Sequence, residues 1–333
     1  MDRRLFLSVP LAATAAAVTG GLAGCGGSGS GSGKKIDVRL GDTVNETNPE
    51  IASERFFGER IAALTDGKYQ VKVFPNSTLG DHNRMNEQVR QGTLQMTKTL
   101  SSNLTAFDKR IGICSLPYAF AKQDELFTAL DGAYGKALAG ILDGYDLKVL
   151  AYFDSGARNV YNKKRAIRTP GDLKGLRIRV PQDAVMIDTF NTLGAQATPL
   201  STNEIYSALQ QGVIDAAENN PIFYVTNKHV EEARYFSWTR HQFGIDMLLV
   251  SKKWFADQPA KMQDAFVQAG VEAQQEERSR WRTETEAYAK QAADKGAKLN
   301  DDVDVAAFQQ AVRPVLDKNR STFGDLLKYL PVS

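Results

Sequence analysis

Short runs of alternating apolar and polar residues predict β-strands along the chain. The clearest is YQVKVF (Tyr69–Phe74), which has the two-residue period of a half-buried strand. Similar runs predict strands over residues 35–42, 93–100, 146–154, 157–163, 176–181 and 213–219. Residues 243–252 are apolar enough to form a buried strand next to the first group.

Segments with apolar residues three or four positions apart lie between these strands and predict helices. Residues 49–64 have this spacing and are followed by the breaker Asp66-Gly67. Further helices are expected over residues 81–90, as a pair around 124–142, and over 183–193, 202–211 and 305–330. Because strand and helix alternate, the pattern predicts an α/β fold built from parallel βαβ units.

Residues 259–294 have the composition of one long helix. After Pro259 the stretch contains no proline, and Gly270 is its one breaker. A single helix of this length would extend about 50 Å at 1.5 Å per residue, so we expect it to bridge two parts of the molecule. The alternative is two helices broken near Gly270.

The N-terminus has the features of an export signal. Residues 1–25 begin with basic side chains, continue through a short apolar stretch and end in small residues. The tetrapeptide LAGC resembles a bacterial lipobox, which would make Cys25 the lipid-bearing residue, and RRLFL resembles a twin-arginine signal. The alternative for Cys25 is coincidence, and the export route stays open. Residues 26–35 are a Gly/Ser tether, as a membrane-anchored domain would need.

Composition and motifs exclude several classes of function. The 333 residues carry a net charge of +2. The sequence contains no basic run interleaved with aromatic residues, the pattern that would favour nucleic-acid binding. After Cys25 only Cys114 remains, in an apolar run, so we expect a buried thiol, no disulfide within the domain and no cysteine metal site. The three histidines lack metal-ligand spacing, and no hydrolase, P-loop or dinucleotide motif occurs. The sequence therefore predicts neither an enzyme nor a cofactor.

Two arginines stand in unusual settings. Arg158 follows a Ser-Gly hinge in YFDSGARNVYN, and Arg179 lies on the polar face of the predicted strand in LRIRVP. Arg177 shares that face, and all three would by themselves be ordinary surface cations.

Six segments together resemble the DctP family, the substrate-binding proteins of TRAP (tripartite ATP-independent periplasmic) transporters. They are VFPNSTLGDHNRMNEQVRQGTLQM, SLPYAF, DSGARNVYN, DLKGLRIRVPQ, LGAQATPLSTNEIYSALQQGVIDAAENNP and LLVSKKWF. The resemblance implies a two-lobed periplasmic binding protein with a hinge and a long helix spanning both lobes. With the predicted elements, it places lobe I at residues 36–156 plus 244–284 and lobe II at 157–243 plus 285–333. A periplasmic, lipid-anchored protein that delivers a small organic acid to TRAP membrane subunits is expected.

The resemblance also implies a carboxylate site. Arg158, Arg179 and Asn219 fall on the positions that meet the ligand carboxylate in the family, with Arg179 making the main two-pronged contact. A guanidinium suits this role because its planar fork matches a carboxylate and stays charged.

The rest of the ligand should meet side chains at strand ends, where open α/β sheets bind ligands. The candidates are Asn45, Asp81, His82, Lys98 and Thr202. The segments DSGARNVYN and IDAAENNP resemble the branch that binds uronates and other sugar acids, and the polar candidates suit hydroxyl groups. Lys98 favours the alternative of a C4-dicarboxylate, because a second cation would suit a second carboxylate. A ligand-sensing module for a signalling partner is a further alternative.

Overall fold

The computed structural model describes residues 35–331. The predicted signal peptide, Cys25 and all but the last residue of the tether lie outside these residues. Within them no helix is long and apolar enough to cross a membrane. The strands are β1 (Ile36–Gly41), β2 (Tyr69–Phe74), β3 (Met96–Leu100), β4 (Leu147–Asn162), β5 (Arg177–Val180), β6 (Gln196–Pro199), β7 (Ala216–Asn219), β8 (Tyr235–Ser251) and β9 (Lys298–Asn300).

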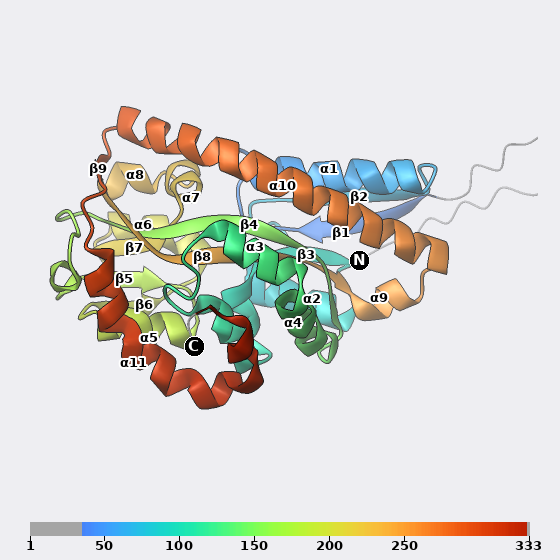
Figure 1. Cartoon of the computed structure of the whole chain (residues 1–333). Coiled ribbons are helices and arrows are strands. Elements are labelled where there is room, and N and C mark those ends of the chain that lie inside the picture. The colour runs from blue at the N-terminus through green and yellow to red at the C-terminus, as the bar shows by residue number, and fades with distance from the viewer. Residues whose placement is uncertain (1–34, 332–333) are drawn as a thin grey trace, which may run out of the picture. The chain divides into compact units, whose positions relative to one another are not determined.

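These strands form one mixed sheet in the order β2-β1-β3-β8-β4-β7-β5-β6, and β9 pairs with β8 (Figure 1). At one end β1 is parallel to β2 and β3, and at the other β5 is parallel to β6 and β7. The predicted parallel units are therefore confirmed at both ends. Between them β8 runs antiparallel to β3 and β4, and β4 runs antiparallel to β7, which the alternation of elements did not predict.

The two long strands β4 and β8 pair with each other through the middle of the sheet. The two strands predicted on either side of Ser155-Gly156 are one continuous strand, β4, because register shifts absorb the irregular residues. Gly156 lies in one of these shifts with φ of +68°, a conformation that glycine adopts without strain. β8 begins eight residues before the strand predicted at residue 243.

The helices cover the sheet. They are α1 (Pro49–Leu64), α2 (His82–Gln91), α3 (Gln123–Asp131), α4 (Ala133–Asp143), α5 (Ala184–Thr192), α6 (Ile205–Gln210), α7 (Pro221–Thr226), α8 (His229–Glu232), α9 (Lys252–Ala256), α10 (Ala260–Asp294) and α11 (Val305–Phe323). Helix α1 has the predicted bounds, with Asn48 as its N-cap. Helix α11 ends seven residues earlier than predicted, at Gly324 with φ of +50°, and a 3₁₀ turn (Gly324–Tyr329) follows.

Helix α10 is a single helix of 35 residues, so the two-helix alternative is wrong. Gly270 does not break the helix but lets it approach β4, because a Cβ on Gly270 would lie 2.6 Å from the carbonyl oxygen of Leu150. The helix packs against α1, β4 and α7, and it crosses the whole sheet in Figure 1. It therefore connects the two ends of the sheet, as its length predicted.

Hydrophobic cores hold these layers together. One buried cluster lies between helices α1 and α10 and the strands they cover. It includes Val38, Phe57, Leu248 and Phe266. A second cluster around Tyr161 packs α7 and α8 against β4, β7 and β8. Cys114 is buried, as expected, and burial raises the pKa of its thiol to about 12.

Candidate ligand-binding site

A polar pocket opens at the ends of strands from both halves of the sheet. The space that no atom fills there is about 470 Å³, a figure that includes open solvent at its mouth. Six of the eight predicted residues line it: His82, Lys98, Arg158, Arg179, Thr202 and Asn219. The structure therefore brings together side chains that lie up to 137 residues apart in the sequence.

Arg179 combines deep burial with unused hydrogen-bonding capacity. Strand β5 positions the side chain, which is 4% exposed, and its Nε and Nη2 donate to the carbonyl oxygen of Leu200 at 2.9 and 2.7 Å. Of the five N–H groups of an arginine, the other three have no acceptor among the described residues. Burial lowers the pKa of Arg179 to about 10, so the side chain is still charged at neutral pH. A buried guanidinium with N–H groups still available on its two Nη atoms is suited to bind a ligand carboxylate.

Arg158 differs from Arg179 because its charge is already paired. Its Nε donates to Glu218 Oε2 at 2.6 Å, and its Nη2 donates to Glu218 Oε1 at 2.8 Å. Burial by itself would raise the pKa of Glu218, but the charge of Arg158 and the hydrogen bonds from Arg158 and His241 together outweigh it, and the pKa falls to about 2. Nη1 of Arg158 donates to none of the residues in the described part. Arg158 can thus offer a ligand two N–H groups but little unbalanced charge.

Asn219 ends strand β7 two residues beyond Ala217, the residue that pairs with Arg179 of β5. The side chains of Asn219 and Arg179 therefore project to the same face of the sheet. Oδ1 of Asn219 accepts a hydrogen bond from the backbone N–H of Asn220 at 2.9 Å. Its Nδ2 donates to no residue between positions 35 and 331 and is available to the pocket.

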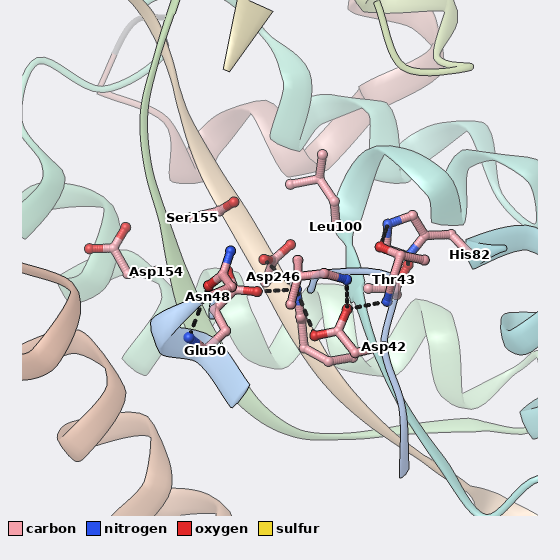
Figure 2. Close-up of polar contacts among 12 residues, drawn as sticks. Asp42, Thr43, Asn48, Glu50, His82, Leu100, Asp154, Ser155 and Asp246 are labelled. Carbon is pink, nitrogen blue, oxygen red and sulfur yellow. Dashed lines mark hydrogen bonds and ion pairs between the residues drawn. The ribbon is translucent and has the colours of Figure 1, made fainter. Parts of the chain in front are cut away.

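His82 is held as a neutral imidazole. Its Nε2 lies 2.8 Å from Thr43 Oγ1 (Figure 2), and its Nδ1 lies 3.2 Å from Thr99 Oγ1. Burial, followed by the charge of Lys98, lowers the pKa of His82 to about 4. Near neutral pH the ring is therefore an uncharged polar group, held in place by two threonine side chains, and not a cation.

Lys98 lines the pocket but is not the free cation that the sequence indicated. Its Nζ lies 3.1 Å from Asp246 Oδ2 and 3.3 Å from Asp42 Oδ2, and it also contacts Glu50. The ammonium group is thus surrounded by carboxylates from α1, from β8 and from the residue that follows β1. Figure 2 shows Asp42, Glu50 and Asp246 converging from these elements. Lys98 therefore does not supply the second cation on which the dicarboxylate alternative depended.

Asn45 and Asp81 do not line the pocket. Nδ2 of Asn45 donates to the carbonyl oxygen of Thr226 at 2.8 Å, which ties the loop after β1 to α7. Asp81 is the N-cap of α2, accepting from the backbone N–H of Arg84 at 2.8 Å, and it lines a hollow beside the pocket together with His82 and Arg179. Both side chains have structural partners, and their contact with a ligand stays a prediction.

The pocket also contains residues that the sequence analysis missed. Glu50 and Asp246 are two of them, and Trp281 of α10 is a third. Trp281 is 2% exposed, and its Nε1–H has no hydrogen-bond acceptor among the described side chains and backbone groups. The available signal for it was a tryptophan within the polar run QQEERSRWRTETE.

The fold and the pocket together define a solute-binding protein of the two-lobed α/β class, with an arginine-lined site. Residues 40–322 match the family described as bacterial extracellular solute-binding protein, family 7, and the chain belongs to this DctP family. As such it is a substrate-binding protein of the TRAP transporter type, and proteins of this family work in the periplasm.

Several known proteins are similar to this chain. A solute-binding protein of Chromohalobacter salexigens is 33% identical over 262 residues, covering 79% of this chain and 78% of its own. The 2,3-diketo-L-gulonate-binding periplasmic protein YiaO of Escherichia coli is 30% identical over 296 residues, covering 87% and 90%. The crystal structure of a TRAP solute-binding protein from Sulfitobacter sp. NAS-14.1, with bound β-D-galacturonate, has a TM-score of 0.87 at 30% identity, covering 90% and 100%. The predicted family and fold are confirmed.

Proposed function

We propose that this protein binds a sugar acid with one carboxylate in the pocket and delivers it to the membrane subunits of a TRAP transporter. The observation that carries the proposal is the buried guanidinium of Arg179, three of whose N–H groups have no acceptor in the described part of the chain. Each hydrogen bond between such a cation and a carboxylate contributes about 1.5–3 kcal/mol. Similar structures contain galacturonate, glucuronate and galactonate, which supports this ligand class.

The ligand carboxylate would meet Arg179 end-on, with Nη1 of Arg158 and Nδ2 of Asn219 at its sides. Thr202 and His82 would flank the sugar carbons. We place the lobes at residues 36–156 plus 244–284 and 157–243 plus 285–333, with the hinge where β4 and β8 pass between them. Closure of the lobes would remove water from the carboxylate and strengthen its contact with Arg179.

We also infer that the mature chain is attached to a membrane through a lipid on Cys25. A chain released from the membrane would not need the Gly/Ser segment that follows this residue. A Cys25→Ala variant, expressed with its own signal, should move from the membrane fraction to the soluble periplasmic fraction. A wild-type protein that is already soluble would contradict the anchor.

A ligand screen tests the function itself. Differential scanning fluorimetry with uronates, aldonates and C4-dicarboxylates should show a clear rise in melting temperature for the sugar acids, because a ligand that binds only the folded protein stabilises it. Shifts with neutral sugars or amino acids alone would overturn the proposal. Isothermal titration calorimetry on the best ligand then gives the affinity.

A further inference from the structure

The pocket that Arg158 and Arg179 line also reaches a group of buried acids around one lysine. The side chains of Asp42, Glu50 and Asp246 are at most 4% exposed, and each contacts the ammonium group of Lys98. These three carboxyl groups and Lys98 are called the acidic end of the pocket. One ammonium balances one carboxylate, so the other two carboxyl groups carry uncompensated negative charge or hold a proton. The charge of Lys98 is therefore already balanced within the acidic end and is not available to pair with a ligand carboxylate.

The acidic end has hydrogen-bonding capacity that the described residues do not use. Glu50, Lys98 and Asp246 line the same pocket as Arg179. Oδ1 of Asp246 is buried and accepts no hydrogen bond within the described residues, although its Oδ2 contacts Lys98. Independently, the buried Nε1–H of Trp281 in this pocket has no acceptor among residues 35–331. Buried polar atoms without partners destabilise the protein, so a polar ligand that supplies the partners would be favoured.

A hydroxyl group and a carboxylate would fare differently here. A hydroxyl donates its hydrogen to Asp246 Oδ1 or Glu50 and can accept from Lys98 or Trp281, so it suits both kinds of partner. A carboxylate has no hydrogen to donate, and it would stand against like charges with its hydration removed. Burial raises the pKa of Glu50 well above its usual value, which makes Glu50 a potential donor as well.

We propose that the acidic end selects against a second carboxylate, so that the protein binds sugar acids with one carboxylate and rejects the matching dicarboxylates. The inference rests on the proposed function and adds its specificity. Arg179 attracts the carboxylate, and Asp246, with a buried Oδ1 that accepts no hydrogen bond within the described residues, disfavours a second carboxylate in the same molecule. Specificity of this kind depends on a repulsive element as much as on an attractive one.

Matched pairs of ligands test the proposal by calorimetry. Galactonate and galactarate are both open-chain, as are gluconate and glucarate, and each pair differs in the oxidation of one terminal carbon. Galacturonate and glucuronate complete the panel. We expect the best monocarboxylate to bind at least about tenfold tighter than either dicarboxylate. A dicarboxylate that binds as tightly overturns the inference and leaves the proposed function standing. If no sugar acid binds, the proposed function itself fails, and the inference with it.

A charge variant sharpens this test. Asp246→Asn keeps the shape and removes one negative charge, so the preference for a monocarboxylate should shrink at least threefold. Asp183→Asn is the matched control, because Asp183 is buried at the N-cap of α5, does not line the pocket, and has a pKa raised to about 6 by burial. The control should keep the wild-type ratio. Equal ratios in the wild type and a folded Asp246→Asn, checked by circular dichroism, would contradict the role of Asp246. The panel on the wild-type protein decides the question if this variant does not fold.

Discussion

Arg158 and Glu218 form a buried ion pair across neighbouring strands, with Nε to Oε2 at 2.6 Å and Nη2 to Oε1 at 2.8 Å. Nη2 also donates to the backbone oxygen of Glu218 at 3.1 Å. Both side chains are at most 2% exposed. The pair fixes Arg158 at the wall of the pocket, and it leaves Arg179 as the cation whose charge is open to a ligand.

Removing the charge of Glu218 should destabilise the protein strongly. Glu218→Gln leaves the Arg158 guanidinium buried without its counter-ion, which costs about 3–5 kcal/mol of unfolding free energy. Urea denaturation at pH 7 measures the loss. Asp294→Asn is the control, since its partner Lys290 is exposed and surface pairs contribute little. Equal losses in the two variants would contradict the importance of the buried pair.

The same pair predicts a loss of stability in acid. The pKa of Glu218 falls from its usual 4.5 to about 2 in the folded protein, so its contribution is present above pH 4.5 and disappears as the pH falls from 4.5 to 2. The stability difference between wild type and Glu218→Gln should therefore narrow over this range. A difference that stays constant down to pH 2 would exclude ionisation of Glu218 as its cause.

Arg179→Lys should weaken ligand binding at least about tenfold with little change in melting temperature. Lysine keeps the charge but lacks the planar fork that meets both carboxylate oxygens. Calorimetric titration with the best ligand of the screen measures the effect. Arg177→Lys on the same strand is the control, because Arg177 is half exposed and pairs with Asp215. Wild-type affinity in Arg179→Lys would remove the carboxylate role of this residue.

Asp154 predicts a second pH effect with the opposite sign. Burial raises its pKa from 3.8 to about 7, so from pH 3.8 to 7 the unfolded chain loses this proton while the folded protein retains it. Stability should decline as the pH rises through this range. Asp154→Asn should make the fall in melting temperature from pH 4 to 7 at least about 2 °C smaller. The amide oxygen can still accept from Gly156 N–H. Parallel curves for the two proteins would contradict the shift.

Gly156→Ala should impair both folding and binding. At φ of +68° any side chain is strained by about 1–2 kcal/mol, and the new Cβ would lie 2.8 Å from Nε1 of Trp281 in the pocket wall. Gly175→Ala is the control, since Gly175 has φ of +75° and no neighbour within 4 Å of the new Cβ. The control should lower the melting temperature less and leave ligand affinity unchanged. Equal effects would mean that the contact with Trp281 is unimportant.

Sequence periodicity predicted the elements that have one buried face. Helix α1 and strand β2 have the expected bounds because their apolar residues follow a single period. The first half of β8 was missed, since both of its faces are largely covered and its buried positions include Ser237, Thr239 and His241. Such a strand has no alternation to detect, and its polar side chains are satisfied by partners that the local sequence does not contain.

The sequence by itself determined the family, the alternating elements, the long helix and the arginines near the pocket, because motifs and periods are local properties of a chain. Tertiary structure alone decided the electrostatics of the site. Lys98 is neutralised by carboxylates 48, 56 and 148 positions away, and Arg158 is paired with Glu218, whereas Arg179 retains a free fork. The electrostatic potential in the pocket is the sum of contributions from all nearby charges. Folding decides which charges lie nearby and which are buried away from water, so the local sequence cannot give this potential.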